Sequence, residues 1–206
     1  MILNPEQLTH QDCYKLLIGS VVPRPIAWVS SMDLAGNLNV APFSYFTIAS
    51  NQPMTLIFCV GPVAEGDRQK DTLRNIHALS EFVINLTNEE TAQAMNRTAT
   101  ALPAEQSEFE WAGLTPADSE AIRVPRVAEA PIAFECKLRQ VVVISEEPGG
   151  GSVVFGDVQR VHVRDDLYAG GRISLERLRP IGRLAGAGYV RVTDTFDMER
   201  IPPPSA

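Results

Sequence analysis

Arg24 is the residue whose setting most clearly suggests contact with an anion, because it lies between Pro23 and Pro25. The two proline rings fix φ and restrict the neighbouring backbone, so the guanidinium is held in a narrow range of directions. A pre-positioned guanidinium suits a phosphate group. The apolar run that follows, from Ile26 to Val29, predicts a strand. The plainer interpretation is therefore an edge strand whose Arg24 points into water, and the residues alone do not decide between the two.

A second candidate for anion binding is the run Lys70-Asp71-Thr72. If a helix begins at Thr72, its first N–H groups lack acceptors, and its dipole presents positive charge to a ligand. Lys70 adds a mobile point charge, and the Thr72 hydroxyl adds a donor. These residues alone favour the plainer interpretation, an N-cap at Asp71 or Thr72 that follows a solvated lysine.

The segment from Asn39 to Phe46, NVAPFSYF, is a candidate wall for a planar ligand. Small or conformationally restricted residues would let backbone groups approach a flat heterocycle, and Phe43, Tyr45 or Phe46 offers an aromatic face. The same pattern is typical of a strand end whose aromatic side chains belong to the core. The sequence supports both interpretations equally.

The chain shows no recognisable set of residues for acid–base, nucleophilic or metal chemistry. His10, His77 and His162 are isolated, and no CxxC, HxxxH or HExxH pattern occurs, so we expect no metal site. A GxSxG nucleophile elbow is absent. Arg183 lies in a glycine-rich turn, but its glycines do not match the GxGxxG dinucleotide pattern. An anion contact and a planar wall without a catalytic side chain indicate a cofactor that performs the chemistry itself.

The candidate binding residues must be positioned by a mainly antiparallel β-structure with peripheral helices. Strand-like runs outnumber helical ones, and tight turns join several of the strand-like runs. Pro42 cannot donate to a ladder, so we expect the strand that begins at Leu38 to end at Ala41. The region 97–131 predicts a long loop with one short helix, and a loop of that length is usually functional. The expected strands are 26–31, 38–41, 54–60, 81–86, 132–144, 153–163 and 188–192, and the expected helices are 11–18, 72–79, 88–95 and 175–178.

Length and composition limit the classes of protein to which the chain can belong. Its 206 residues fit one domain, 1–206, with a substantial core. A net charge of -7 argues against a general nucleic-acid binder, which needs a basic face. The apolar runs are too short to span a bilayer, and the N-terminus has no signal-peptide pattern, so we expect a cytoplasmic protein without membrane contact. The three cysteines are widely separated, which favours free thiols.

Several stretches together resemble the flavin reductase-like family of FMN-binding split β-barrels, the branch that includes flavoredoxins and the reductase components of two-component monooxygenases. The matching stretches are, in chain order, 14–31, 36–46, 70–76, 81–85, 125–127, 135–138 and 180–184. The resemblance covers most of the chain, from Leu16 to Tyr189. It implies a six-stranded antiparallel Greek-key split barrel with peripheral α-helices. It also implies a homodimer that holds FMN non-covalently near the subunit interface.

The resemblance also assigns cofactor contacts by position. Residues 27–31 would run along the flavin and its ribityl chain, and residues 41–44 would contact the edge of the isoalloxazine ring. Lys70 and Thr72 would hold the phosphate, and Asp71 would fix the turn. The full set of cofactor-binding residues implied in this way is Arg24, Ala27, Trp28, Val29, Ser30, Ser31, Ala41, Pro42, Phe43, Ser44, Ser50, Lys70, Asp71, Thr72 and Arg183.

The function implied is that of an NAD(P)H-dependent flavin reductase, an FMN-binding oxidoreductase that supplies reduced flavin or electrons to a monooxygenase or another acceptor protein. Because the flavin performs the chemistry, no catalytic side chain is expected. A non-enzymatic FMN-binding electron carrier or flavin store stays open as an alternative, since the chain has no fingerprint for a nicotinamide ribose or adenine. A role like that of pyridoxamine-phosphate oxidase ranks last, because no basic cluster suits a second phosphate-bearing ligand.

Overall fold

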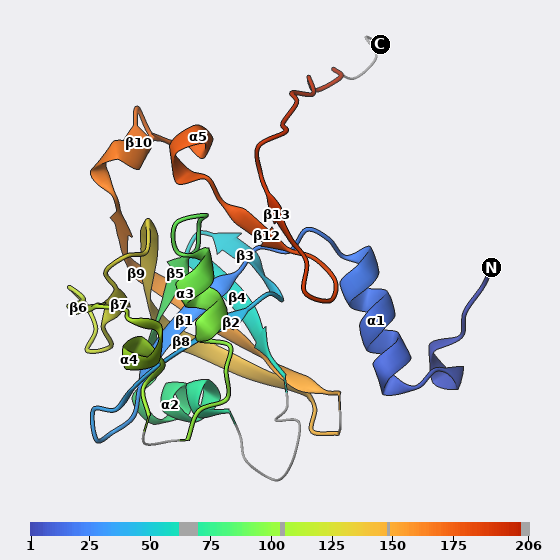
Figure 1. The fold of residues 1–206 in the computed structure, drawn as a ribbon, viewed down its shortest axis with the longest axis horizontal. Helices are drawn as coiled ribbons and strands as arrows, with labels where there is room; N and C mark the ends of the chain where they lie inside the picture. Colours follow the sequence, from blue (N-terminus) through green and yellow to red (C-terminus); the bar gives the residue numbers. More distant parts are fainter. Residues whose placement is uncertain (62–69, 104–105, 148, 203–206) are drawn as a thin grey trace.

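The computed structural model describes residues 1–61, 70–103, 106–147 and 149–202. Its main element is a seven-stranded antiparallel sheet (Figure 1). In chain order its strands are β1 (Ala27–Met32), β2 (Leu38–Phe43), β3 (Phe46–Asn51), β4 (Met54–Val60), β5 (Glu81–Leu86), β8 (Ile132–Ser145) and β9 (Gly151–Val163). Their order across the sheet is β2-β1-β5-β8-β9-β4-β3. The predicted mainly antiparallel β-structure is confirmed, and most of the loop expected at 61–67 lies outside the described residues.

The sheet curls into a barrel that is split between β2 and β3. These strands lie at opposite edges of the sheet, yet only Ser44 and Tyr45 separate the end of β2 from the start of β3. The two edges must therefore come together at this corner. The prediction of six strands is wrong, because the sheet has seven strands, and β3 lies in a stretch to which no strand was assigned.

Strand β2 continues through Pro42, contrary to the prediction, because it is an edge strand. Its outward backbone faces α4 (Glu108–Ala112) instead of another strand, and the Val40 N–H donates to the Glu108 carboxylate at 3.2 Å. Pro42 lies two residues further along the same edge and has no N–H that would need a partner. The proline therefore fits this edge without breaking a ladder hydrogen bond.

Helices lie on the outside of the barrel and at its ends (Figure 1). Besides α4 they are α1 (His10–Ser20), α2 (Asp71–Leu79), α3 (Ala92–Arg97) and α5 (Leu175–Leu178), with short 3-10 turns at Pro5–Gln7 and Asp165–Leu167. A helix was predicted over 88–95, but α3 begins only after Thr91. Asn88 and Thr91 cap one another, since each backbone N–H donates to the other side chain at 3.1 Å. This local turn competes with helical geometry and delays the start of α3.

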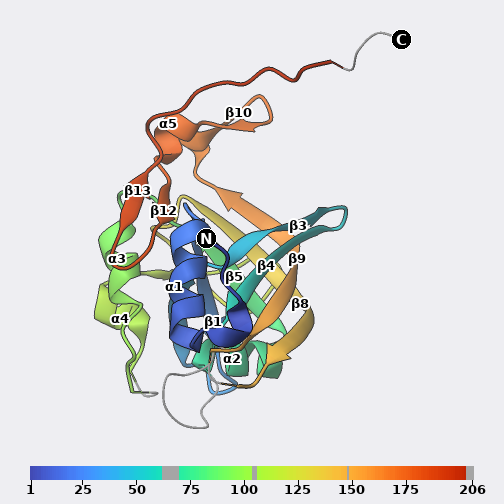
Figure 2. The same cartoon turned by 90° about the vertical axis from the view of Figure 1, so that its right-hand side faces the viewer.

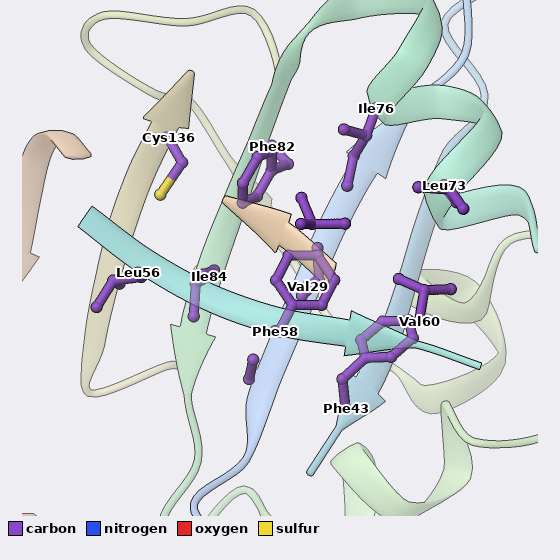
Figure 3. Packing of buried hydrophobic residues seen from close by; sticks show 12 residues of the cluster. Val29, Phe43, Leu56, Phe58, Val60, Leu73, Ile76, Phe82, Ile84 and Cys136 are labelled. Atoms are coloured by element: carbon purple, nitrogen blue, oxygen red, sulfur yellow. The ribbon is translucent and has the colours of Figure 1, made fainter. Parts of the chain in front are cut away.

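The interior of the barrel is filled by apolar side chains from the strands and from α2 (Figure 3). Phe58 is fully buried in this cluster, and its ring centroid lies 5.2 Å from that of Phe43 and 5.6 Å from that of Phe82. Gly156 on β9 makes room for the Phe82 ring, because a Cβ atom at Gly156 would lie 2.4 Å from Phe82 Cζ. The barrel wall that carries the candidate site is thus backed by a continuous aromatic core.

A second apolar cluster covers the outer face of β1 and β2. Trp28 contributes to it together with Met95 of α3 and Phe109 of α4. The segment 98–131 crosses this face and carries α4 and a small hairpin, β6 (Pro116–Ala117) with β7 (Arg126–Val127). The predicted excursion with one short helix is confirmed, and the hairpin is an addition to it.

Buried polar side chains of the barrel hold this excursion in place. Asn85 Oδ1 accepts a hydrogen bond from the Val127 N–H at 2.9 Å. The Glu135 carboxylate accepts from the N–H groups of Glu120 and Ala121, both at 2.7 Å. Each bond pairs a buried side-chain acceptor with loop backbone, which satisfies both groups.

Both ends of the described chain extend away from the barrel (Figures 1 and 2). Helix α1 has only one buried side chain, that of Ile18. After the hairpin β12 (Ile181–Arg183) and β13 (Tyr189–Arg191), the chain continues as an extended segment whose Phe196 and Met198 are 84% and 83% exposed. A further two-stranded ribbon consists of β10 (Tyr168–Ala169) and β11 (Arg172–Ile173). Across the described ranges, no helix combines the length and the apolar character needed to cross a membrane.

Candidate functional site

The N-terminus of α2 carries backbone donors. Lys70 is the N-cap residue, and its side chain makes no capping hydrogen bond. The Lys70 carbonyl accepts from the N–H groups of Leu73 and Arg74 at 3.0 and 3.1 Å. The N–H groups of Asp71 and Thr72 precede these and have no intrahelical acceptor. The helix thus begins one residue before the predicted position, and within the described ranges the N–H groups of Asp71 and Thr72 at its positive dipole end have no acceptor.

A buried polar network beneath this helix end holds the Thr72 hydroxyl. Asn39 on β2 donates from Nδ2 to Thr72 Oγ1 at 3.0 Å and to Ser31 Oγ at 3.3 Å. Asn75, one turn further along α2, donates to the same Ser31 oxygen at 3.2 Å. Because both hydroxyl oxygens accept from amide groups, their hydrogens remain to be donated elsewhere. Thr72 is 2% exposed, and its hydroxyl hydrogen has no acceptor among the described residues.

Lys70 connects the helix end to the aromatic wall of the barrel. Its Nζ lies 5.7 Å from the centroid of the Phe43 ring, within the range of a cation–π contact. Burial of the ammonium group lowers the pKa of Lys70 below its ordinary value of 10.5, although the residue as a whole remains exposed. An anion beside Nζ would relieve this unfavourable loss of hydration.

Two carboxyl groups lie near this end of α2, those of Asp71 and Glu108. Asp71 forms an ion pair with Arg74, with 2.6 Å between Oδ1 and Nη1. Burial raises the pKa of Glu108, and the charge of Asp71 raises it further, while the N–H of Val40 partly opposes the shift. Arg74 thus supplies a positive partner for Asp71, and burial disfavours the charged form of Glu108.

Ser44 lies at the split of the barrel, where Arg24 contacts it from behind. Arg24 Nε donates to Ser44 Oγ at 3.3 Å, and the other hydrogen bonds of the guanidinium go to backbone carbonyl groups. Arg24 is 6% exposed, so it is not a solvated arginine on an edge strand. Its donors face protein acceptors, so the predicted direct anion contact by Arg24 has no support in this geometry.

The side chains of residues 27–30 are buried and contact other parts of the protein. Ala27 and Val29 belong to the barrel core, and Trp28 is fully buried, with its Nε1 donating to Thr98 Oγ1 at 2.9 Å. Ser30 donates to the Pro125 carbonyl at 2.7 Å. The backbone of this strand pairs with β2 on one side and β5 on the other. Of the predicted run 27–31, only the Ser31 side chain belongs to the polar network beside α2.

The remaining predicted residues divide between the barrel corner and more distant positions. Strand β2 runs through Ala41, Pro42 and Phe43 to Ser44, so residues 41–44 form a continuous wall. Lys70 contacts this wall at the Phe43 ring. Ser50 lies six residues beyond Ser44 along an extended chain, roughly 20 Å away at the usual rise per residue. Its hydroxyl accepts from the Gln52 N–H at 3.1 Å in the β3–β4 turn. The structure does not bring Ser50 to the α2 end of the site.

Arg183 is held within its own hairpin. Its Nη1 donates to the Gly188 carbonyl at 2.9 Å, and its guanidinium stacks on the Tyr189 ring at 4.6 Å. The Arg183 backbone pairs with that of Arg24 through two hydrogen bonds. Arg183 therefore lies beside the entrance of β1 as a neighbour of Arg24, not as a free cation.

Sequence reasoning missed Asn39, Asn75 and Glu108 as members of the site. Asn75 follows Thr72 by three residues, and this spacing places both on one helix face, which is a signal that could have found it. Asn39 stands in the quoted run NVAPFSYF, but its role depends on the contact of β2 with α2. Glu108 is 68 residues from its partner Val40, and no local pattern reports that pairing.

A cavity of about 390 Å³ lies elsewhere, between α3 and the β12–β13 hairpin. Ala92, Ile181 and Val190 contribute apolar surface to it, and Glu89 on its rim is paired with Arg191 at 3.2 Å. It includes none of the predicted site residues. We place the candidate site at the N-terminus of α2 and the β2–β3 corner, because several hydrogen-bond donors lie there. In the cavity, by contrast, Glu89 already forms an ion pair with Arg191.

The arrangement can bind an anion at one end and a flat ring at the other. The donors at the anion end are two backbone N–H groups, the Thr72 hydroxyl and the Lys70 ammonium. The wall of residues 41–44 is lined by small and aromatic groups and ends at the Ser44 hydroxyl. Across the described residues, no three His, Cys, Asp or Glu side chains are grouped so that they could hold a metal ion.

These features define a class: a split antiparallel β-barrel with a candidate site at the start of α2 and the β2–β3 corner. The chain belongs to the flavin reductase-like family. The family model described as "Flavin reductase like domain" matches residues 18–175, which include the candidate site. The resemblance seen in the sequence motifs is thereby confirmed.

Known proteins similar to the whole chain agree with this assignment. The structure of nitrilotriacetate monooxygenase component B from Bacillus cereus has a TM-score of 0.91 and 42% identity, covering 96% of this chain and 98% of that chain. The 2-nitrobenzoate 2-nitroreductase NbaA of Pseudomonas fluorescens has a TM-score of 0.88 and 33% identity, covering 100% of this chain and 98% of that one. An uncharacterized protein of Halalkalibacterium halodurans is 41% identical over 97% of this chain and 96% of its own length. Family and neighbours together support an oxidoreductase role with a flavin as cofactor or substrate.

Proposed function

We propose that this protein binds FMN and reduces it with NADH or NADPH, and that it passes reduced flavin or electrons to a partner protein. The observation that carries the proposal is the set of donors at the start of α2: the Lys70 ammonium, the Thr72 hydroxyl and two backbone N–H groups that have no acceptor among the described residues. A phosphate monoester is the part of FMN that needs such donors, because charge-assisted hydrogen bonds to phosphate are stronger than neutral ones.

The residues on either side of this point fit the rest of the cofactor. Residues 41–44 would lie along the edge of the isoalloxazine ring, with Phe43 behind it and the Ser44 hydroxyl as a donor. Ser31 and Asn39 would support the phosphate end from beneath. When bound, FMN supplies a ring that accepts a hydride and releases electrons singly or in pairs. The chain's own task is to bind and orient this ring, which agrees with a site that contains no acid–base pair.

The neighbours favour delivery of reduced flavin to a second enzyme. Nitrilotriacetate monooxygenase component B, at 42% identity, carries the name of one part of a larger oxygenase system. NbaA, at 33% identity, carries the name of a nitroreductase, an enzyme that uses its electrons on its own substrate. The first is the function we adopt, because the overlap with component B is closer in both sequence and structure.

The direct test is to mix the purified protein with FMN and with NADH or NADPH and to follow oxidation of the nicotinamide. Oxidation that depends on both protein and FMN supports the proposal. Riboflavin, which lacks the phosphate, is the matched control for the α2 site and should bind more weakly. Absence of nicotinamide oxidation combined with tight retention of FMN would instead indicate an electron carrier or flavin store. Absence of any flavin binding would overturn both functions.

We also propose that the protein forms a homodimer through the face that carries α1 and β3. Tyr14, Leu17 and Val21 form one stripe along α1 and are 55%, 54% and 57% exposed. Ile48 on β3 is 67% exposed. Figure 2 looks onto this face and shows α1 in front with the β3–β4 ribbon beside it.

Two further properties of this face support a symmetric interface. Exposed apolar residues on a helix and on an edge strand are typical of surfaces that bind another protein. A two-fold axis would cover the same stripe on both copies at once, without a third component. The Ser44 corner lies at the start of β3, so this interface would run close to the ring end of the flavin site.

A further inference from the structure

The guanidinium of Arg24 links three separate parts of the chain at the barrel split. Its Nη1 donates to the Ile18 carbonyl at 2.9 Å and to the Val21 carbonyl at 2.8 Å, at the end of α1. Its Nη2 donates to the Leu184 carbonyl at 3.1 Å, next to β12. Its Nε donates to Ser44 Oγ at 3.3 Å. Four of its five N–H groups are thus engaged, and the flanking prolines restrict the backbone that carries it.

This contact determines how the Ser44 hydroxyl can be used. A guanidinium has donors but no acceptor, so Ser44 Oγ must be the acceptor in this pair. The single hydroxyl hydrogen of Ser44 is consequently directed away from Arg24. Within the described ranges, the Ser44 hydroxyl donates to no protein group, and Ser44 is half-buried at the corner between β2 and β3.

The alternative role for Arg24, direct contact with a ligand phosphate, does not agree with this geometry. Three of its hydrogen bonds hold backbone carbonyl groups, and the residue is buried. The Tyr45 ring also covers it, with the centroid 5.9 Å from Cζ. Arg24 would have to release α1 or the β12–β13 hairpin before it could turn toward a ligand.

We propose that Arg24 is a positioning residue that makes Ser44 an obligate hydrogen-bond donor to the edge of the bound flavin ring. This inference rests on the proposed function, and it assigns a different role to each of the two residues. Ser44 touches the ring, and Arg24 acts only through Ser44. A donor held in this way stabilises the ring most when the ring carries more electrons, so it favours the reduced flavin.

The test is a double-mutant cycle with Arg24→Lys and Ser44→Ala, read through the FMN dissociation constant, the visible absorption band of the bound flavin and its midpoint potential. Lysine keeps the charge and can still reach a carbonyl of α1, but it has no Nε donor fixed toward Ser44. We expect Ser44→Ala to weaken FMN binding by about three- to tenfold, the usual effect of one hydrogen bond. We expect both single variants to shift the absorption band and to make the potential more negative.

Coupling between the two sites decides whether Arg24 acts through Ser44. If it does, the double variant shifts the potential no further than Ser44→Ala alone. Additive shifts would overturn the inference, and so would an Arg24→Lys variant whose band and potential match those of the wild type. A purely structural Arg24 lowers the melting temperature of the flavin-free protein without either spectroscopic change, and this outcome also overturns the inference.

The matched control is Arg139→Lys, because Arg139 pairs with Asp157 at 2.7 Å on the exposed side of β8 and should leave every flavin readout unchanged. A wild-type protein that binds no flavin would refute the proposed function and the inference together. A wild type that binds flavin while its Arg24→Lys variant behaves identically would refute the inference alone.

Discussion

Asn39 donates a hydrogen bond from Nδ2 to the Thr72 hydroxyl at 3.0 Å, across the contact between β2 and the start of α2. Because the threonine oxygen accepts this bond, its hydrogen is free for a group in front of the helix. The same amide reaches Ser31 on β1 at 3.3 Å. Residues of β1, β2 and α2 thus fix the direction of one donor.

We expect Thr72→Val to weaken FMN binding by about one order of magnitude or more. The substitution keeps the β-branched shape and removes the hydroxyl, and a hydrogen bond to a charged group contributes about 1.5–3 kcal/mol. Fluorescence titration with FMN measures the loss, and riboflavin should bind the variant and the wild type equally. An equal loss for both flavins would show that Thr72 does not face the phosphate.

The pKa of Lys70 predicts how FMN binding depends on pH. Burial lowers this pKa below 10.5, so the ammonium loses its charge at a lower pH than an ordinary lysine does. FMN affinity should therefore be constant near neutral pH and fall as pH rises through the lowered pKa. Lys70→Arg keeps its charge throughout and should remove the decline. A decline of the same size with riboflavin or in Lys70→Arg would contradict this assignment.

The phosphate half of the proposed site could be predicted from the sequence because helix N-termini depend on residues that are close in the chain. The run Lys70-Asp71-Thr72 indicated a helix start, and the helix begins within one residue of the predicted position. Asn39 and Thr72 are 33 residues apart, and their contact follows only from the packing of β2 against α2. No pattern along the chain reports such a contact.

The direction of side chains on a central strand was the least predictable feature. On β5, Phe82 and Ile84 belong to the barrel core and Val83 to a separate cluster, as the alternation of side chains along a strand predicts. On β1, however, both faces are covered, one by the barrel core and one by the excursion 98–131. Trp28 therefore lies in a core, whereas the apolar run alone was equally consistent with a ligand wall.

Trp28→Phe should destabilise the fold without affecting the flavin. The indole Nε1 donates to Thr98 at 2.9 Å inside a buried cluster, so the exchange loses a hydrogen bond and leaves a small void. We expect the free energy of unfolding in urea to fall by about 1–3 kcal/mol, with unchanged FMN affinity of the folded protein. Trp111→Phe is the control, because Trp111 on α4 is 55% exposed. A specific loss of FMN binding in Trp28→Phe would indicate that Trp28 contributes to the flavin site.

Glu135→Gln should loosen the excursion from the barrel. Burial alone raises the pKa of Glu135, but the N–H groups of Glu120 and Ala121 and the His162 side chain outweigh it and hold this pKa below 4.5. The carboxylate therefore stabilises the fold fully above pH 4.5, and this contribution is lost as pH falls through the lowered value.

Glutamine leaves one buried N–H facing an amide nitrogen, which costs about 1–3 kcal/mol of unfolding free energy at neutral pH. Urea unfolding at several pH values should show the difference between Glu135→Gln and the wild type narrowing in acid. Glu110→Gln, at an exposed position of α4, should show no difference at any pH. A gap between Glu135→Gln and the wild type that stays constant in acid would mean that the charge of Glu135 does not hold the excursion.

Leu17→Asp and Ile48→Asp should each convert the proposed homodimer into monomers. Both side chains lie on the α1–β3 face, and a charge within an apolar interface loses its hydration without gaining a partner. Sedimentation measures the change, and Leu34→Asp is the control, because Leu34 is 78% exposed on the β1–β2 turn. If the flavin lies near the interface, the two monomeric variants should also bind FMN more weakly, whereas Leu34→Asp should not. A wild type that sediments as a monomer at all concentrations would contradict the proposed dimer. The proposed flavin site at α2 would still be tested by FMN binding to Thr72→Val and Lys70→Arg.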